Sequence, residues 1–317
     1  MSLKTEGFMQ QKKYGEMSLL EFQDRFGTEE ACQKHLIQMR FPKGFQCPHC
    51  RSERHCFKPG RQEFRCYECN RLTSPTAGTI FHQSHVPLRK WFWCIYLLST
   101  PKKAVSTLYL ARQLMVNYKT AWSMRRKIQN AMAHRDAQYQ LEGPVEVDEI
   151  WIGGKQTFEK RREIGPNKTP FFLAVSEDKI GAPRFAKASE LENGYQAQEI
   201  EEAAKATIPD PTSCVLKGDA HGAHQNMANH GYTLEISNQT KNPEVTVEHL
   251  KWVNIVTSNL KRYLISTHHG VFGTYRKEYV AEFLYRFNRR FWPGQAFDRL
   301  LFANIFKGPM PLRTAGG

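Results

Sequence analysis

The chain has 317 residues, of which 40% are hydrophobic, and it carries a formal net charge of +14 with a pI of about 9.4. This length allows about two or three units with buried cores, and the basic balance favours a polyanionic partner, nucleic acid first. The absence of any apolar run of about 18 or more residues, and of a signal-peptide pattern, argues against a membrane protein. We therefore expect a cytoplasmic protein, associated with the nucleoid of a prokaryote.

Residues 1–41 are expected to form a short helical segment after a polar lead without pattern. From Ser18 onward the apolar residues recur at helical spacing, and both Ser18 and Thr28 are suited as N-caps because glutamates follow them. Pro42 and Gly44 then end the second of two short helices.

Two cysteine pairs predict a zinc ribbon over residues 42–80. Each pair has the spacing C-x-x-C, and fifteen residues separate the two pairs. Such pairs supply four thiolates to one zinc ion, while the intervening hairpin closes the tetrahedron. Four thiolates leave no open coordination position, so we expect the zinc to be structural and not catalytic. The predicted ligands are Cys47, Cys50, Cys66 and Cys69.

The other four cysteines are scattered, which indicates reduced thiols and not a disulfide framework. They are Cys32, Cys56, Cys94 and Cys214. His49, His55 and Cys56 lie near the two pairs and are alternative zinc ligands, but we expect them to be surface or hairpin residues.

Residues 81–142 combine helical patterns with a one-sided charge. Between Glu68 and Asp136 the sequence contains no acidic residue. A solvated face usually mixes both signs, so this segment favours contact with DNA phosphates. Two helices, over residues 106–114 and 118–132, are joined by a tight turn and predict a helix-turn-helix. The second helix would enter the major groove, with phosphate contacts from Lys119, Arg125, Arg126 and Lys127.

A boundary at Gly143-Pro144 is followed by strand patterns. The stretch from Val145 to Ile152 alternates apolar and acidic residues, which predicts a strand that presents Asp148 to a divalent cation. Its neighbour Glu149 either contributes to the site or faces the other side of the strand. Strand and helix patterns at residues 171–175, 185–187, 195–206 and 214–217 predict a mixed sheet in an α/β layer.

The pattern at residues 214–217 leads to a second carboxylate, Asp219. An aspartate at the end of a strand more often caps a helix or a turn, but placed beside Asp148 it becomes a candidate ligand.

A helix predicted over residues 250–264 carries two further polar candidates. Asn254 and Lys261 share one face because they lie seven positions apart. An amide carbonyl can bind a hard cation, and a lysine can contact a DNA phosphate near that cation. From the helix alone, Asn254 would be an ordinary polar residue.

A C-terminal helix around residues 279–287 is expected to pack in the core through an aromatic stripe at helical spacing. Arg286, Arg289 and Arg290 are candidates for contact with the DNA backbone, whereas His268 and His269 are expected in a loop. A frayed tail is expected at residues 308–317.

Taken in order, these features resemble the insertion-sequence transposases that carry an N-terminal zinc ribbon and a DDE-type catalytic domain, relatives of the eukaryotic Merlin elements. The separations are 71 residues from Asp148 to Asp219 and 35 from Asp219 to Asn254, with Lys261 seven further on. The resemblance covers nearly the whole chain, through motifs at residues 44–50, 147–155, 218–221, 258–261 and 285–290.

The resemblance implies an RNase H-like catalytic domain over residues 143–307. It places the first aspartate on the first strand, the second after the fourth strand, and the third ligand on a later helix. The third position is often glutamate in the wider pattern, whereas this chain has Asn254, whose neutral amide supplies less charge. The resemblance also implies double-stranded DNA as partner, both terminal inverted repeats and target DNA, and a homo-oligomer that is a dimer or a larger synaptic assembly.

The implied reaction is attack on a DNA phosphodiester. Two Mg²⁺ or Mn²⁺ ions would activate the attacking oxygen and neutralise the transition state. Asp148 would bridge both ions, Asp219 and Asn254 would each complete one shell, and Lys261 would orient the scissile strand. The same site would hydrolyse the element's end and later join its 3′-hydroxyl to target DNA. Two alternatives stay open: a DNA-binding regulator without catalysis, and an RNase H-like nuclease without strand transfer.

Overall fold

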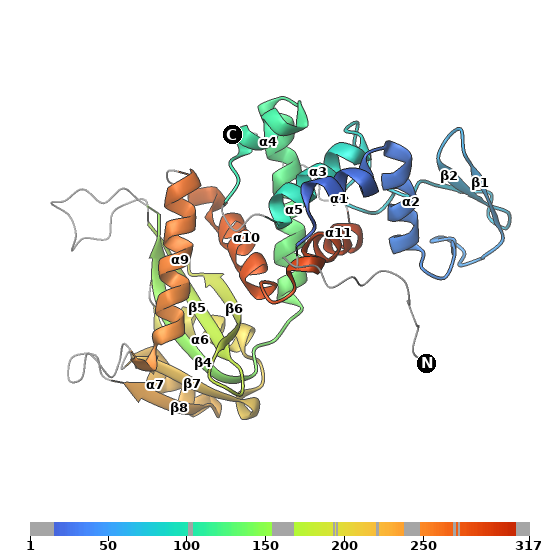
Figure 1. The fold of residues 1–317 in the computed structure, drawn as a ribbon. Helices are drawn as coiled ribbons and strands as arrows, with labels where there is room; N and C mark the ends of the chain where they lie inside the picture. Colours follow the sequence, from blue (N-terminus) through green and yellow to red (C-terminus); the bar gives the residue numbers. More distant parts are fainter. Residues whose placement is uncertain are drawn as a thin grey trace. The chain divides into compact units, whose positions relative to one another are not determined.

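The computed structural model describes residues 16–100, 104–153, 168–192, 194, 196–219, 222–237, 248–268, 271 and 273–308 (Figure 1). Most of the expected polar lead, the tail beyond residue 308, and His269 lie outside these residues. Two compact units are present: the N-terminal unit (Met1–Ala131 with Phe291–Gly317) and the sheet unit (Met132–Arg290). None of the described helices combines the length and apolarity that a membrane crossing requires.

The N-terminal unit begins with two capped helices, α1 (Leu19–Phe26) and α2 (Glu29–Arg40). The side chains of Ser18 and Thr28 each accept a backbone N–H three residues later over 3.1 Å. These bonds satisfy donors that a first helical turn leaves without an intrahelical partner, so both predicted N-caps are confirmed.

The ribbon that follows is a small antiparallel sheet with its own core. Its strands are β1 (His55–Lys58), β2 (Glu63–Cys66) and β3 (Leu72–Thr73), in the order β1-β2-β3. The rings of Phe45 and Phe64 stack with centroids 4.3 Å apart, and both residues are buried with Cys47 and Cys66. This core is too small to stabilise the ribbon alone, so a bound metal would add to the stability of the ribbon.

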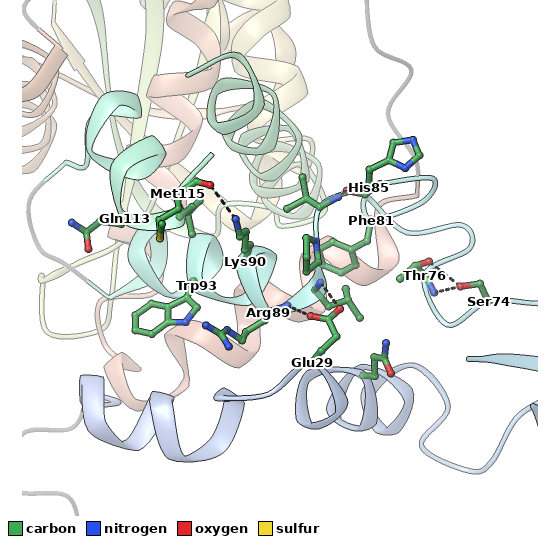
Figure 2. Close-up of a pocket in the computed structure, with 16 residues that line it drawn as sticks. Glu29, Ser74, Thr76, Phe81, His85, Arg89, Lys90, Trp93, Gln113 and Met115 are labelled. Atoms are coloured by element: carbon green, nitrogen blue, oxygen red, sulfur yellow. Dashed lines mark hydrogen bonds between the residues drawn. The ribbon is translucent and has the colours of Figure 1, made fainter. Parts of the chain in front are cut away.

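Helices complete the N-terminal unit. Glu29 of α2 caps α3: its carboxylate accepts the backbone N–H groups of Leu88 and Arg89 at 2.7 and 2.9 Å, within a pocket of this unit (Figure 2). The bounds are α3 (Leu88–Ser99), α4 (Thr107–Leu114), α5 (Tyr118–Ala137, which crosses the boundary between the units), the 3₁₀ turn η5 (Pro293–Gln295) and α11 (Ala296–Phe306).

The last helix, α11, returns to this unit. Phe297 packs with its ring 5.1 Å from that of Phe26 and 5.7 Å from that of Phe92. The helix therefore belongs to the N-terminal unit, although it lies within residues 143–307, the range we assign to the catalytic domain. The domain boundaries stay predictions.

The sheet unit is built on five strands in the order β6-β5-β4-β7-β8. The pairs β4·β5 and β5·β6 are antiparallel, whereas β4·β7 and β7·β8 are parallel, so the sheet is mixed as predicted. The strands are β4 (Gly143–Ile152), β5 (Thr169–Glu177), β6 (Pro183–Glu190), β7 (Cys214–Asp219) and β8 (Thr233–Ser237).

Helices cover both faces of this sheet (Figure 1). On one face, Val145 and Val147 of β4 pack with Ile200 and Ala204 of α6. On the other face, α9 contacts β4 and β5, and α10 contacts β6. The bounds are α6 (Ala197–Thr207), α7 (Gly222–Asn226), α9 (Lys251–His268) and α10 (Arg276–Asn288), with 3₁₀ turns η2 (Pro211–Ser213), η3 (Met227–His230) and η4 (Gly273–Tyr275).

Candidate metal sites

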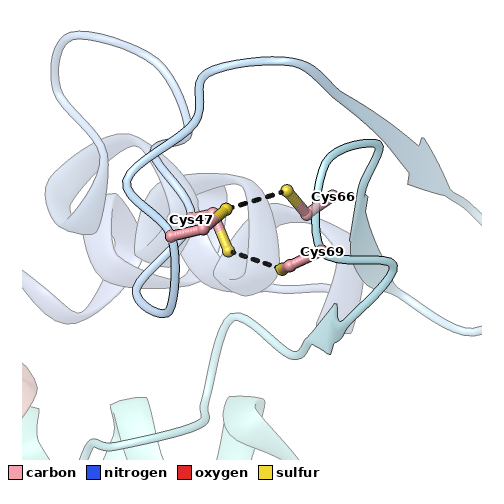
Figure 3. A group of neighbouring side chains, drawn as sticks. Cys47, Cys66 and Cys69 are labelled. Atoms are coloured by element: carbon pink, nitrogen blue, oxygen red, sulfur yellow. Dashed lines mark hydrogen bonds between the residues drawn. The ribbon is translucent and has the colours of Figure 1, made fainter.

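The four cysteines predicted to bind zinc come together in the ribbon (Figure 3). Their Sγ atoms all lie within 4.8 Å of one another; those of Cys47 and Cys69 are 3.6 Å apart, and those of Cys50 and Cys66 are 3.4 Å apart. A tetrahedral zinc with Zn–S distances of about 2.3 Å holds its sulfur atoms about 3.8 Å apart. The cluster therefore fits a structural zinc.

The nearby alternatives lie outside this cluster. Nδ1 of His49 accepts a hydrogen bond from Arg71 at 2.7 Å, and Nδ1 of His55 lies 2.6 Å from the carbonyl oxygen of Glu53. Cys56 lies on β1. His49 is exposed and His55 shares β1 with Cys56, so these are the surface or hairpin residues that we expected.

Asp148 and Asp219 are neighbours on parallel strands. In the register of β4 and β7, Glu146 lies opposite Lys217, and each aspartate follows two residues later. Because side chains alternate along a strand, both carboxylates lie on the face covered by α9. Burial raises the pKa of Asp148 to about 7, and the negative charges of Glu149 and Asp219 contribute to this rise. A cation between the aspartates would relieve this repulsion.

Glu149 faces the other side of the sheet, the second of the two possibilities we considered. There its Oε1 lies 2.8 Å from Nε2 of His224 on α7, and Nδ1 of the same ring lies 2.9 Å from Oδ1 of Asp219. Burial alone would lower the pKa of His224, but the hydrogen bonds to Asp219 and Glu149 outweigh it and raise that pKa to about 10. The imidazolium donates to both carboxylates.

His224 was not predicted as a site residue, because its only signal in the sequence is its position five residues after Asp219.

Asn254 and Lys261 are exposed residues of α9. The helix is held against β4, since the backbone N–H of Val253 donates to Oε2 of Glu146 over 2.7 Å. Nδ2 of Asn254 donates to the carbonyl of Leu250 at 2.8 Å, so its amide oxygen is the atom suited to a cation. A cation at Asp148 and Asp219 would need such further oxygens, from Asn254, water or a DNA phosphate.

The four cationic residues predicted to contact DNA differ in exposure. Lys119 is exposed near the start of α5, and Arg126 lies over the ring of Trp122. Lys127 is partly buried, and burial lowers its pKa. Arg125 is fully buried and donates to the carbonyl of Val105. A buried guanidinium that holds the backbone does not reach a DNA phosphate, so Arg125 is a structural residue.

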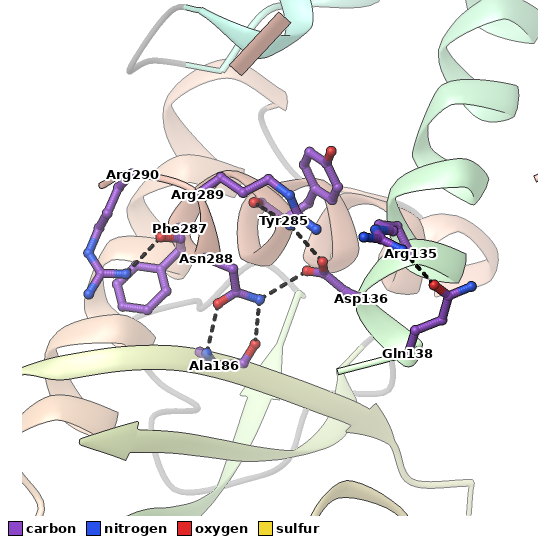
Figure 4. A network of polar contacts seen from close by, with 9 residues as sticks. All are labelled: Arg135, Asp136, Gln138, Ala186, Tyr285, Phe287, Asn288, Arg289 and Arg290. Atoms are coloured by element: carbon purple, nitrogen blue, oxygen red, sulfur yellow. Dashed lines mark hydrogen bonds and ion pairs between the residues drawn. The ribbon is translucent and has the colours of Figure 1, made fainter. Parts of the chain in front are cut away.

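The three arginines at the end of α10 make contacts within the sheet unit, and Figure 4 shows two of them, Arg289 and Arg290. Nη1 of Arg289 lies 2.6 Å from Oδ1 of Asp136, and Arg290 donates to the carbonyl of Phe287 at 2.7 Å. The guanidinium of Arg286 lies 5.7 Å from the ring centre of Tyr263. These contacts hold Arg289 and Arg290 within the sheet unit, and contact of the three arginines with the DNA backbone stays a prediction.

Comparison with known proteins matches two regions of the chain to domains of transposases. Residues 27–71 match the transposase zinc-ribbon domain, and residues 140–288 match the ISXO2-like transposase domain. Together the two matches span more than half of the chain. An uncharacterized protein in transposable element ISH50 of Halobacterium salinarum is 34% identical over 131 residues, which are 40% of this chain. The match spans 43% of that relative's length.

Among solved structures, a pre-cleavage Mos1 transpososome is 12% identical and matches 63% of this chain and 75% of that one, with a TM-score of 0.26. A Mos1 transposase paired-end complex with the left transposon end is also 12% identical and matches 64% of this chain and 76% of that one, with a TM-score of 0.28. Structural similarity at these TM-scores does not contribute to the family assignment, which rests on the two domain matches. The chain belongs to the insertion-sequence transposases that carry a zinc ribbon ahead of an ISXO2-like transposase domain.

Proposed function

We propose that the protein binds the inverted repeats of its element, cuts the element's ends and joins them to target DNA. The observation that carries this proposal is the pair Asp148 and Asp219, placed side by side on one face of the sheet within the transposase domain. The first aspartate lies on the first strand of the sheet, the second at the end of the fourth, and Asn254 on a later helix. This order agrees with the one that the resemblance to DDE-type transposases implies, which supports the proposal.

Each residue of the site has a distinct role in this proposal. Asp148 would hold both cations, and Asp219 and Asn254 would each add an oxygen to one of them. When bound, two Mg²⁺ or Mn²⁺ ions supply the charge that activates the attacking oxygen and stabilises the leaving one. Lys261, two turns further along the exposed side of α9, would contact a phosphate of the scissile strand.

DNA binding in this proposal belongs to the helix pair α4 and α5 of the N-terminal unit. The two helices are joined by the short turn Met115–Asn117, and Oδ1 of Asn117 caps α5 by accepting the N–H of Thr120 at 2.7 Å. Lys119 and Arg126 would contact phosphates from α5. The family resemblance further suggests that two or more copies act together on paired ends.

The proposal is tested with Asp148→Ala and Asp219→Ala on DNA that carries the inverted repeats flanking the gene. Both variants should lose cleavage in Mg²⁺ or Mn²⁺ and the joining of a pre-cut 3′ end to a plasmid, while a gel shift shows that they bind the repeat like the wild type. Glu202→Ala, which removes an exposed carboxylate from α6, should retain all three.

The alternative functions predict other results. Joining or cleavage by either aspartate variant would overturn the site assignment. A wild-type protein that cuts but never joins would be the nuclease, and one that only binds would be the regulator.

A further inference from the structure

His224 connects the two faces of the sheet at the end of β7. Its side chain is 3% exposed and contacts Asp219 on one side and Glu149 on the other, at 2.9 and 2.8 Å. The ring passes against the backbone of Gly218, where an added Cβ would lie 2.9 Å from Nδ1. A side chain at position 218 would therefore displace the imidazole.

The hydrogen bonds fix the orientation of this ring completely. A carboxylate only accepts hydrogen bonds, so both ring nitrogens must donate. Glu149 is itself buried, with 6% of its side chain exposed, and it holds the distal nitrogen in place. Of these two carboxylates, Asp219 is the one that reaches the surface, with 33% of its side chain exposed.

We propose that His224 is a positioning residue for Asp219, with Glu149 as its outer partner. This inference rests on the proposed cation-dependent function. Nδ1–H holds Oδ1 of Asp219, which restricts the rotation of the carboxylate that would bind the cation. Residues that orient metal ligands in this way contribute about 10- to 100-fold to metal affinity. Glu149 thus acts on the site from the opposite face without binding the metal.

The alternative is that the three residues only fasten α7 to the sheet. Stability alone would then change on mutation, while the affinity of the folded protein for a cation would stay the same. The test therefore measures cation binding directly, with Mn²⁺ as the probe, by electron paramagnetic resonance of free Mn²⁺ in titrations of the full chain.

His224→Ala should weaken Mn²⁺ binding by about 10- to 100-fold, and Glu149→Gln, which no longer accepts through a charged oxygen, should weaken it less. His224→Asn retains a donor near the position of Nδ1 and should restore part of the affinity. The pair His230 and Glu201 provides the matched control, because it is a second histidine–carboxylate contact of the sheet unit, with 3.1 Å between the two side chains. His230→Ala and Glu201→Gln should leave Mn²⁺ affinity within about twofold of the wild type.

Thermal unfolding selects the variants that are folded at the titration temperature. If His224→Ala does not fold, His224→Asn and Glu149→Gln carry the test. If the folded His224 and Glu149 variants bind Mn²⁺ with wild-type affinity while Asp219→Ala does not bind it, the inference is overturned and the proposed cation site stands. Equal Mn²⁺ binding by the wild type, Asp148→Ala and Asp219→Ala would instead overturn the proposed cation site, and the inference with it.

Discussion

Val253 donates its backbone N–H to Oε2 of Glu146 over 2.7 Å, which ties the first turn of α9 to the middle of β4. The N–H groups of a first turn have no acceptor within their own helix, so a buried carboxylate on the sheet is a strong partner. Asn254 is the next residue along the helix, and Asp148 is two residues further along the strand. This hydrogen bond therefore fixes the position of Asn254 relative to Asp148, the two candidate ligands.

Replacing Glu146 by Ala should lower the free energy of unfolding of the sheet unit by about 1–3 kcal/mol, because a buried N–H loses its acceptor. Glu146→Gln retains an acceptor oxygen and should cost less. Urea unfolding of the full chain, followed by tryptophan fluorescence, measures the change. Glu235→Ala, at an exposed position of β8, is the control and should change the free energy by less than about 0.5 kcal/mol. Equal losses in Glu146→Ala and Glu235→Ala would contradict this account.

Removal of zinc should unfold the ribbon, because its core of stacked phenylalanines and buried cysteines is small. Protein purified with zinc should contain one zinc ion per chain, and chelation should expose the four cluster thiols to a thiol reagent. Cys32 will not add to the number of reactive thiols at pH 8, since burial raises its pKa to about 12 and keeps the thiol protonated.

The matched pair of variants for this prediction is Cys66→Ser and Cys56→Ser. Both residues lie in the ribbon strands, but only Cys66 belongs to the cluster. Cys66→Ser should lose zinc and Cys56→Ser should keep it, as measured by metal analysis of the purified proteins. Zinc retained in Cys66→Ser would exclude the four-thiolate site.

DNA binding gives a prediction for the exposed side of α5. Lys119→Ala should weaken binding to the inverted repeat and lower the slope of log K against log salt by about 0.9, the value for one lost phosphate contact. Lys205→Ala removes an equally exposed lysine from α6 and should leave the slope unchanged. Fluorescence anisotropy at several salt concentrations gives both slopes, and identical slopes for the two variants would remove Lys119 from the interface.

The parts of this protein that could be predicted from sequence are those whose chemistry is local along the chain. The spacing of two C-x-x-C pairs defines four ligands without knowledge of the fold, and the caps at Ser18 and Thr28 depend on residues three positions away. The alternation around Asp148 likewise determines a strand and its two faces.

The remaining features depend on pairs that are far apart in sequence. Glu149 and His224 are separated by 75 positions, and Glu146 and Val253 by 107, so no periodic pattern connects them. The strand β8 was not predicted because it is short and most of its residues are exposed, although Leu234 packs against the core of the sheet unit. Arg125 looked like its cationic neighbours in the sequence, and only its burial separates it from them.

The contact between Arg289 and Asp136 provides the last prediction. Both side chains are buried, at 7% and 14% exposure, and Nδ2 of Asn288 donates to the second carboxylate oxygen at 2.9 Å while its amide also binds the backbone of Ala186 (Figure 4). Burial raises the pKa of Asp136, and Arg289 and Asn288 counteract that effect. The group joins α5, α10 and β6 within the sheet unit.

Asp136→Ala leaves the buried guanidinium of Arg289 without its counter-charge and should lower the free energy of unfolding by about 3–5 kcal/mol. Arg289→Met removes that charge, so the double variant should lose less than the sum of the two single variants. Glu201→Ala breaks the more exposed contact with His230 in the same unit and should cost about 1 kcal/mol or less. Urea unfolding at pH 7 measures all four variants. Strictly additive losses at positions 136 and 289 would mean that the two side chains do not stabilise the unit as a pair.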